Sequence, residues 1–246
     1  MTWKMNGRPI EIHPDLQAAS RRAAELFVEI ARQSIKRDER FDLALSGGST
    51  PRLLYTLLGS EFSSEIDWNR THLFWADERC VPPDDEESNY RMVHETLLAR
   101  APIPISNVHR MRGEEDPNRA AAEYEALLRA HFRGLPRFSL ILLGMGADGH
   151  TASLFPYSPA LDERERLTIA TYVEKLKAMR LTLTLRSINN AAHVIFLVAG
   201  AEKAPALRAV FDEKTDARSI PAKLVAPTDG DLLWVVDRAA ASLLAE

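Results

Sequence analysis

The chain has 246 residues, 46% of them hydrophobic and 27% charged, with a formal net charge of −4 at pH 7. This composition is typical of a soluble globular protein and argues against nucleic acid or a membrane surface as a partner. The single cysteine, Cys80, excludes an intramolecular disulfide, and the sequence contains no apolar signal core or membrane-length run. We therefore expect a cytoplasmic protein with one α/β domain over residues 1–246, as a monomer or a small homo-oligomer.

The first predicted elements are a helix and a strand that ends in a glycine loop. Apolar residues recur at helical spacing over residues 16–35, and residues 41–46 form a short apolar run. The loop then leads into a helix, with Thr50 as a possible cap and Pro51 at the first position. The amino end of such a helix favours binding of a phosphate. The alternative interpretation is a strand–turn–helix junction that binds no ligand. The predicted phosphate-binding residues of this loop are Ser46, Gly47, Gly48, Ser49 and Thr50.

A second strand, over residues 71–76, is followed by three consecutive charges, Asp77, Glu78 and Arg79. Open α/β sheets bind ligands at the carboxyl edge of their strands, where these charges are expected to lie. A guanidinium suits a phosphate and a carboxylate suits hydroxyl groups, so Arg79 and Asp77 are predicted to bind substrate. The alternative is the start of a solvated loop. No histidine adjoins Cys80 in sequence, and we interpret this cysteine as a packing residue.

The next segments are helical, separated by polar loops. Residues 82–90 form a polar loop that enters a helix over residues 89–100, and residues 84–91 are a candidate lid. A short extended segment is expected around Val108. A further amphipathic helix starts at Asp116-Pro117, and on it we expect His131 at the edge of the core rather than as a ligand.

A third strand carries the most informative loop of the sequence. Residues 139–143 are apolar, and three glycines punctuate residues 144–150, which also hold Asp148 and His150. Glycines let a backbone turn sharply and approach a ligand closely, so this acid and this imidazole are the predicted catalytic pair. A tight turn with a capping aspartate and an incidental histidine is the alternative interpretation.

The last third of the chain begins with a change of pattern. Residues 167–173 and 179–185 alternate with period two, which predicts a pair of half-exposed strands. A buried strand over residues 193–200 leads into a helix with Lys203 in its first turn. A lysine is electrostatically disfavoured there, and a bound anion nearby would explain its position. The alternative is that Lys203 is an ordinary surface lysine. Further along, we expect an edge segment at residues 220–225, a strand over residues 232–237 and a terminal helix in the alanine-rich tail.

This alternation of strands and helices predicts an α/β fold. We expect a mostly parallel, Rossmann-like sheet with helices on both faces and a small antiparallel excursion near residues 165–186. Successive parallel strands end at one edge, so the glycine loop, Arg79, Lys203 and the Asp148–His150 pair should converge there. The seven histidines are scattered, and neither a metal-ligand spacing nor Gly-x-Ser-x-Gly is present. The pattern therefore predicts a metal-independent enzyme that acts on a phosphorylated metabolite.

Several blocks of the sequence resemble the 6-phosphogluconolactonase family, in order and over nearly the whole chain. They are Leu-Ser-Gly-Gly-Ser-Thr-Pro (45–51), Trp-Ala-Asp-Glu-Arg-Cys-Val-Pro (75–82), Ser-Asn-Tyr-Arg (88–91), Gly-Met-Gly-Ala-Asp-Gly-His-Thr-Ala-Ser-Leu-Phe-Pro (144–156), Arg-Leu-Thr-Leu-Thr (180–184) and Ala-Gly-Ala-Glu-Lys-Ala (199–204). The resemblance implies hydrolysis of 6-phosphoglucono-δ-lactone to 6-phosphogluconate in the oxidative pentose phosphate pathway, without a cofactor. It also implies a fold like that of glucosamine-6-phosphate deaminase and ribose-5-phosphate isomerase.

The same resemblance places the family's catalytic histidine at His150 and its phosphate-binding groups at residues 47–50, Arg79 and Lys203. Ala147 and Ala178 depart from the family pattern, and the second departure leaves the role of Arg180 open. For the reaction we expect His150 to act first as base and then as acid, because one imidazole can take up a proton and return it. Asp148 would orient the ring or a substrate hydroxyl.

Two other functions compete with lactone hydrolysis. Glucosamine-6-phosphate deaminase resembles this chain in the glycine loop and the Asp-Gly-His step, but it has an acid after the histidine where this sequence has Ala152-Ser-Leu-Phe-Pro156. A module that binds a sugar phosphate without turnover would keep the loop, need not keep Asp148 and His150, and is usually fused to a DNA-binding segment. No such segment is recognised in this sequence.

Overall fold

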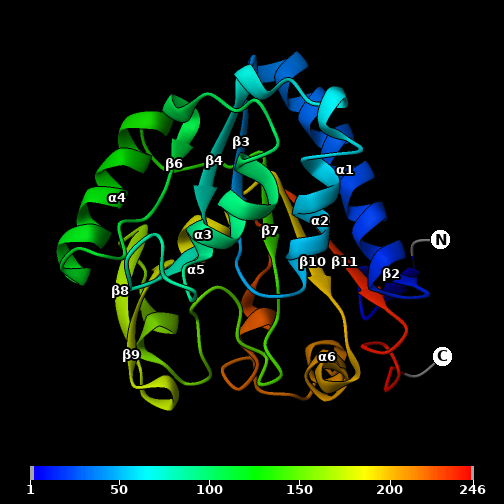
Figure 1. Ribbon diagram of the computed structural model, residues 1–246. Coiled ribbons are helices and arrows are strands. Elements are labelled where there is room, and N and C mark those ends of the chain that lie inside the picture. The colour runs from blue at the N-terminus through cyan, green and yellow to red at the C-terminus, as the bar shows by residue number, and fades with distance from the viewer. Residues whose placement is uncertain (1–2, 245–246) are drawn as a thin grey trace.

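The computed structural model describes residues 3–244, and its centre is an eight-stranded sheet with the order β1-β2-β11-β10-β7-β3-β4-β6 (Figure 1). Apart from the antiparallel β1–β2 pair, the neighbouring strands run parallel. The predicted mostly parallel α/β sheet is confirmed. Its strands are β1 (Trp3–Met5), β2 (Arg8–His13), β3 (Phe41–Leu45), β4 (Thr71–Trp75), β6 (Val108–His109), β7 (Leu140–Leu143), β10 (His193–Val198) and β11 (Asp231–Asp237).

The strand order explains where the site lies. From β3 the chain moves outward to β4 and β6, and it then returns to β7 on the other side of β3 and continues to β10 and β11. The order of the strands therefore reverses between β3 and β7. Loops diverge at such a switch point and leave a crevice at the carboxyl ends of the strands, which is where open α/β sheets bind ligands.

A second, antiparallel sheet has the order β5-β9-β8. The paired strands β8 (Thr168–Val173) and β9 (Ala178–Leu183) confirm the predicted antiparallel excursion. The third strand, β5 (Asp77–Arg79), holds the three charged residues that were expected only to follow the second predicted strand. The chain bends at Ala76, between β4 and β5, and these residues then pair with β9. One continuous segment therefore contributes to both sheets.

The helices surround the central sheet (Figure 1). The predicted helix over residues 16–35 is α1 (Leu16–Asp38), which begins where the Asp15 carboxylate accepts a hydrogen bond from the Ala18 amide at 2.8 Å. Lys36 and Arg37 in its last turn complement the helix dipole. The remaining α-helices are α2 (Pro51–Leu58), α3 (Asn89–Val93), α4 (Pro117–Phe132), α5 (Leu185–Ile188) and α6 (Ala204–Phe211).

Stacked and edge-on aromatic rings fill the core. The rings of Phe196 and Trp234, on adjacent parallel strands, lie 3.9 Å apart with an angle of 2° between their planes. Phe27 of α1 meets Phe41 of β3 edge-on at 5.1 Å. All four side chains are fully buried, and burying each of them contributes about 1.5–3 kcal/mol or more to stability.

Three local predictions were wrong. Thr50 makes no capping hydrogen bond with its side chain, because its backbone is already helical in conformation. Residues 220–225 contain a 3-10 helix (Pro221–Leu224) instead of the expected edge segment, and Pro221 lies at its start, where no amide hydrogen is needed. After β11, residues 238–243 form turns instead of the predicted terminal helix. Strands β1 and β2 were not predicted, because Asn6 and Gly7 split a polar segment without clear alternation.

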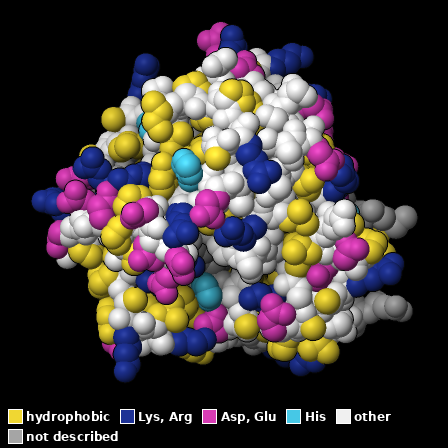
Figure 2. Space-filling view, viewed as in Figure 1, with side chains coloured by type: hydrophobic (Ala, Val, Ile, Leu, Met, Phe, Trp, Pro, Cys, Tyr) yellow, Lys and Arg dark blue, Asp and Glu magenta, His cyan; other side chains and the backbone are white. Residues whose placement is uncertain are grey.

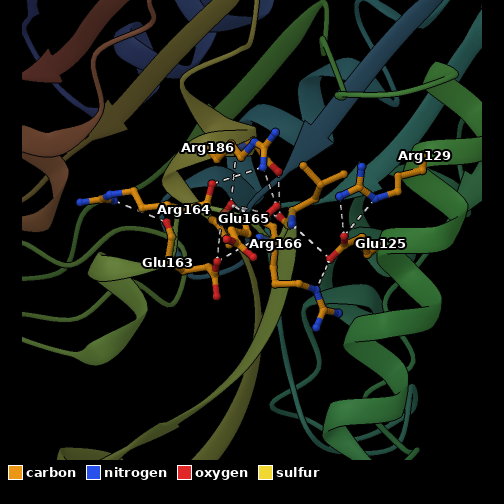
Figure 3. A network of polar contacts seen from close by, with 10 residues as sticks. Glu125, Arg129, Glu163, Arg164, Glu165, Arg166 and Arg186 are labelled. Atoms are coloured by element: carbon orange, nitrogen blue, oxygen red, sulfur yellow. Dashed lines mark hydrogen bonds and ion pairs between the residues drawn. The ribbon is translucent and has the colours of Figure 1, made fainter.

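Glu125 on α4 anchors the small sheet to the rest of the molecule (Figure 3). Its carboxylate accepts hydrogen bonds from Arg129 on the same helix at 2.8 Å and from Arg166 at 2.6 Å, just before β8. It also accepts the Leu167 amide at 3.2 Å. Burial would raise the pKa of Glu125, but the hydrogen bonds to the two arginines outweigh it and lower the pKa. The second sheet is therefore held against α4 through a buried carboxylate.

Over residues 3–244, no helix is long and apolar enough to cross a membrane.

Candidate active site

Four segments converge on one cavity of about 190 Å³ at the carboxyl edge of the central sheet. They are the loop after β3, strand β5, the loop after β7 and the residue that precedes α6. The predicted site residues that line this cavity are Ser46, Gly47, Gly48, Ser49, Thr50, Asp77, Arg79, His150 and Lys203. Asp148 lines an adjoining cavity of about 270 Å³, which shares Arg79, His150 and Lys203 with the first. Figure 2 shows a hollow below the centre of this face, with basic and acidic side chains along its border.

The loop between β3 and α2 is shaped to approach an anion closely. Gly48 has a φ of +96°, which L side chains rarely adopt, and a Cβ on Gly47 would lie 1.7 Å from Oδ1 of Asn89. The buried Tyr55 hydroxyl donates to the Ser46 carbonyl at 2.8 Å and holds the start of the loop. Helix α2 begins directly after the loop, so the positive end of its dipole faces the cavity. This backbone suits a phosphate or a similar anion.

Cationic side chains lie on the other sides of the two cavities. Arg79 and Arg180 are register partners on β5 and β9, so their side chains leave the same face of neighbouring strands. Burial and the nearby Arg79 charge lower the pKa of Arg180. Like charges directly opposite each other destabilise a sheet, and an anion placed between them relieves that repulsion. With Lys203, these arginines supply three positive charges around the adjoining cavity.

Asp77 lines the cavity but is engaged by the protein itself. One carboxylate oxygen accepts from the Ser153 hydroxyl at 2.8 Å, and the other accepts from the Asn89 side-chain amide at 3.3 Å. Asn89 also donates to the Asp77 carbonyl at 2.9 Å. Asp77 therefore ties together β5, the start of α3 and the loop after β7. Its position in the cavity agrees with the prediction, while its hydrogen bonds indicate that it positions these segments.

Glu78 organises the amino end of α3 from a buried position. Its carboxylate accepts the backbone amides of Asn89 at 2.7 Å and Tyr90 at 2.8 Å, and the Ser88 hydroxyl at 3.3 Å. Burial raises the pKa of Glu78 to about 7 even though these hydrogen bonds oppose the shift. A carboxylate at this place fixes Asn89 beside the anion loop.

The acid and imidazole of the loop after β7 form a tight pair. Nδ1 of His150 lies 2.5 Å from Oδ1 of Asp148, and the ring stacks on Phe155 with centroids 4.2 Å apart. Nζ of Lys175, from the turn between β8 and β9, donates to Oδ2 of Asp148 at 3.0 Å. Partial burial would raise the pKa of Asp148, but its bonds to His150 and Lys175 hold that pKa well below the usual range. The carboxylate is therefore ionised and orients the ring.

The positions of Asp148 and His150 leave no room for a side chain at Gly146. A Cβ on Gly146 would lie 2.1 Å from Nδ1 of His150 and 2.7 Å from Oδ1 of Asp148, so the pair would have to move to admit it. The Gly146 amide also donates to the His150 carbonyl at 2.9 Å. Glycine at position 146 therefore has a definite steric cause.

Sequence reasoning did not assign a role to Asn89, Phe155 or Lys175. Asn89 and Phe155 lie within the blocks that carried the family resemblance, so the signal was present without a chemical function. Lys175 lies in an exposed turn and could not be identified, because its partner Asp148 is far away in sequence. Cys80 is half-buried, and burial raises the pKa of its thiol to about 11, which agrees with a packing role.

Comparison with known proteins places this chain in a family. The sequence model of the glucosamine-6-phosphate isomerases/6-phosphogluconolactonase family matches residues 14–234. The chain is 40% identical over 242 residues to the 6-phosphogluconolactonase of Nostoc sp., covering 96% of this chain and 98% of that one. It is 43% identical to the Synechocystis sp. 6-phosphogluconolactonase over 203 residues, covering 80% and 82% of the two chains.

The fold agrees with the sequence comparison. The solved structure of 6-phosphogluconolactonase from Trypanosoma cruzi superposes with a TM-score of 0.86 at 30% identity, covering 100% of this chain and 99% of that one. The predicted resemblance is therefore confirmed by independent comparisons of sequence and structure. The chain belongs to the glucosamine-6-phosphate isomerase/6-phosphogluconolactonase family.

Proposed function

We propose that this protein hydrolyses 6-phosphoglucono-1,5-lactone to 6-phosphogluconate. The observation that carries the proposal is the cavity that joins the anion loop, Arg79 and Lys203 to His150. The names of the relatives from Nostoc and Synechocystis support the same reaction. An anion site beside an imidazole–carboxylate pair fits a substrate with a phosphate at one end and a reactive carbonyl at the other.

In the proposed mechanism, His150 moves one proton twice. Because Nδ1 faces Asp148 at 2.5 Å, Nε2 is the ring nitrogen left to act as the base. Nε2 takes a proton from a water molecule, whose oxygen forms a bond to the lactone carbonyl carbon. The tetrahedral intermediate collapses, the bond to the ring oxygen breaks, and the imidazolium returns the proton to that oxygen. General acid–base catalysis of this kind contributes about 10²–10⁴-fold to the rate.

Phosphate binding sets the geometry of this step. Residues 47–50, Arg79 and Lys203 would hold the phosphate and so fix the carbonyl relative to the water and the imidazole. Energy from a remote group of the substrate is used in this way to orient the reacting atoms. The reaction as proposed uses no cofactor. We further propose a cytoplasmic enzyme, monomeric or a small homo-oligomer, with no nucleic-acid or membrane partner; the lone Cys80 suits a reducing compartment.

Steady-state hydrolysis of freshly prepared lactone tests these roles. His150→Ala should lower kcat by about 10²–10⁴-fold with little change in KM. Arg79→Ala and Lys203→Ala should mainly raise KM, because each removes a charge that binds the phosphate. His13→Ala, on β2 and outside both cavities, is the matched histidine control and should behave as the wild type. Full turnover by His150→Ala would remove the imidazole from the mechanism.

The same preparation separates the competing functions. Ammonia release from glucosamine 6-phosphate would indicate the deaminase, and binding of 6-phosphogluconate without turnover of the lactone would indicate a sensing module. Acid release from the lactone with no ammonia release is the result we expect. The ionised, oriented Asp148–His150 pair favours catalysis, because a binding module has no need of it.

A further inference from the structure

Three histidines from three elements meet at the β6 edge of the central sheet, outside both cavities. They are His72 in β4, His109 in β6 and His131 in the last turn of α4. Each offers one ring nitrogen, and the three nitrogens all lie within 4.8 Å of one another. His72 is near the start of β4, whereas Asp77 and the cavity follow the carboxyl end of that strand.

The spacing of these nitrogens suits a metal ion. Nδ1 of His72 and Nε2 of His109 are 3.2 Å apart. In a tetrahedral site with Zn–N bonds of about 2.0–2.1 Å, two ligand nitrogens are separated by roughly 3.3 Å. The side chains of His72 and His109 thus already stand at the separation that one ion requires, and His131 needs only a modest shift to join them.

The surroundings of the cluster match those of metal-binding histidines. Such histidines commonly use one ring nitrogen for the metal and bond a carboxylate with the other, which fixes the ring. Nε2 of His131 lies 2.7 Å from Oδ1 of the buried Asp42. The rings of Phe74 and Phe132 pack against the histidines, at 4.5 Å from His109 and 4.9 Å from His131. The cluster therefore has both an orienting carboxylate and an apolar wall.

Asp42 is itself held in place by a second partner. Its other carboxylate oxygen, Oδ2, pairs with Nε of Arg40 at 2.9 Å, while Oδ1 faces His131.

We propose that His72, His109 and His131 bind one divalent transition-metal ion of the zinc class. Three imidazole nitrogens and one water molecule complete a tetrahedral set of ligands, for which Zn²⁺ and Co²⁺ are suited. The ion ties the two-residue strand β6 and the end of α4 to β4. None of the three histidines lines the lactone cavity, so the site is independent of the proposed hydrolysis.

Titration with Zn²⁺ and with Co²⁺ as a spectroscopic probe tests the site on the full chain. The wild type should bind one equivalent, give the visible absorption of tetrahedral Co²⁺, and gain roughly 3–6 °C in Tm at ten times Kd. His109→Ala should weaken binding by about 100-fold and abolish the Co²⁺ band, while keeping lactone hydrolysis as a check of folding. His72→Gln provides the same test should His109→Ala fail to fold.

Two control variants distinguish this cluster from other histidines. His150→Ala and His13→Ala should both bind the ion as tightly as the wild type does. Loss of binding in His150→Ala would assign the ion to the active site and overturn the proposal. It would equally be overturned by a wild type that binds neither ion at 1 mM, or by undiminished binding in both cluster variants.

Discussion

The steric requirement at Gly146 leads to a quantitative prediction. In Gly146→Ala the new methyl carbon would lie 2.1 Å from Nδ1 of His150, which is about 1.3 Å short of ordinary contact. The imidazole has to move away by about that distance, and its 2.5 Å hydrogen bond to Asp148 cannot survive the move. A misplacement of roughly 1 Å at a catalytic group can cost about 10²-fold in rate. We therefore expect kcat for lactone hydrolysis to fall by about 100-fold.

The assay is steady-state acid release from freshly prepared lactone, compared with thermal unfolding of the same samples. KM should change little, because Arg79 and the anion loop are not touched. Gly144→Ala is the matched control in the same loop, since a methyl group there meets no atom within 4 Å. We expect it to perturb turnover far less than Gly146→Ala does. A Gly146→Ala enzyme with kcat within about threefold of the wild type would refute the argument that the pair must be held in this geometry.

Three further predictions concern residues around the site. Tyr55→Phe leaves the Ser46 carbonyl without its buried donor and should lower the free energy of unfolding by about 1–3 kcal/mol, measured by urea titration. Because the folded pKa of Glu78 is raised to about 7, this group makes the wild type lose stability as pH rises from about 4.5 to 7. Urea titrations across that range should show that Glu78→Gln removes this loss; a difference between the two proteins that is constant with pH would contradict it. Lys175→Met should lower kcat less than about fivefold, because the lysine that pairs with Asp148 is 68% exposed and such pairs contribute about 0–1 kcal/mol. A loss of 100-fold in the kinetic assay would show that the pair is far stronger than its exposure implies.

The arrangement of charges fits the proposal that a protein with net charge −4 binds an anionic substrate. The register of β5 and β9 places Arg79 beside Arg180, and Lys203 lines the same cavities. The attraction is therefore local and partly buried, where charges are screened less than on the open surface. A globally basic surface is not needed, and Figure 2 shows basic and acidic side chains interspersed over this face.

Many of the secondary structure elements and the site loops could be predicted from the sequence alone. Helical spacing over residues 16–35 predicted α1. Apolar runs that end in a glycine loop or in consecutive charges predicted the strands β3, β4, β7 and β10, because side-chain periodicity records which faces are buried. The loops that follow those four strands were assigned to the site for a local reason. Glycines, a proline at the first helical position and charges after a buried strand each have a meaning within a few residues of chain.

Tertiary structure alone decided what depends on partners far apart in the chain. Three interactions of the site join segments that are distant in sequence. They are the pairing of Asp77–Arg79 with β9, the hydrogen bonds from Asn89 to Asp77, and the hydrogen bond from Lys175 to Asp148. The cluster of three histidines is of the same kind, because its members are more than twenty residues apart in sequence. Periodicity and local propensity specify which face of an element is buried. They do not specify which neighbour it meets, since that depends on the packing of the whole chain.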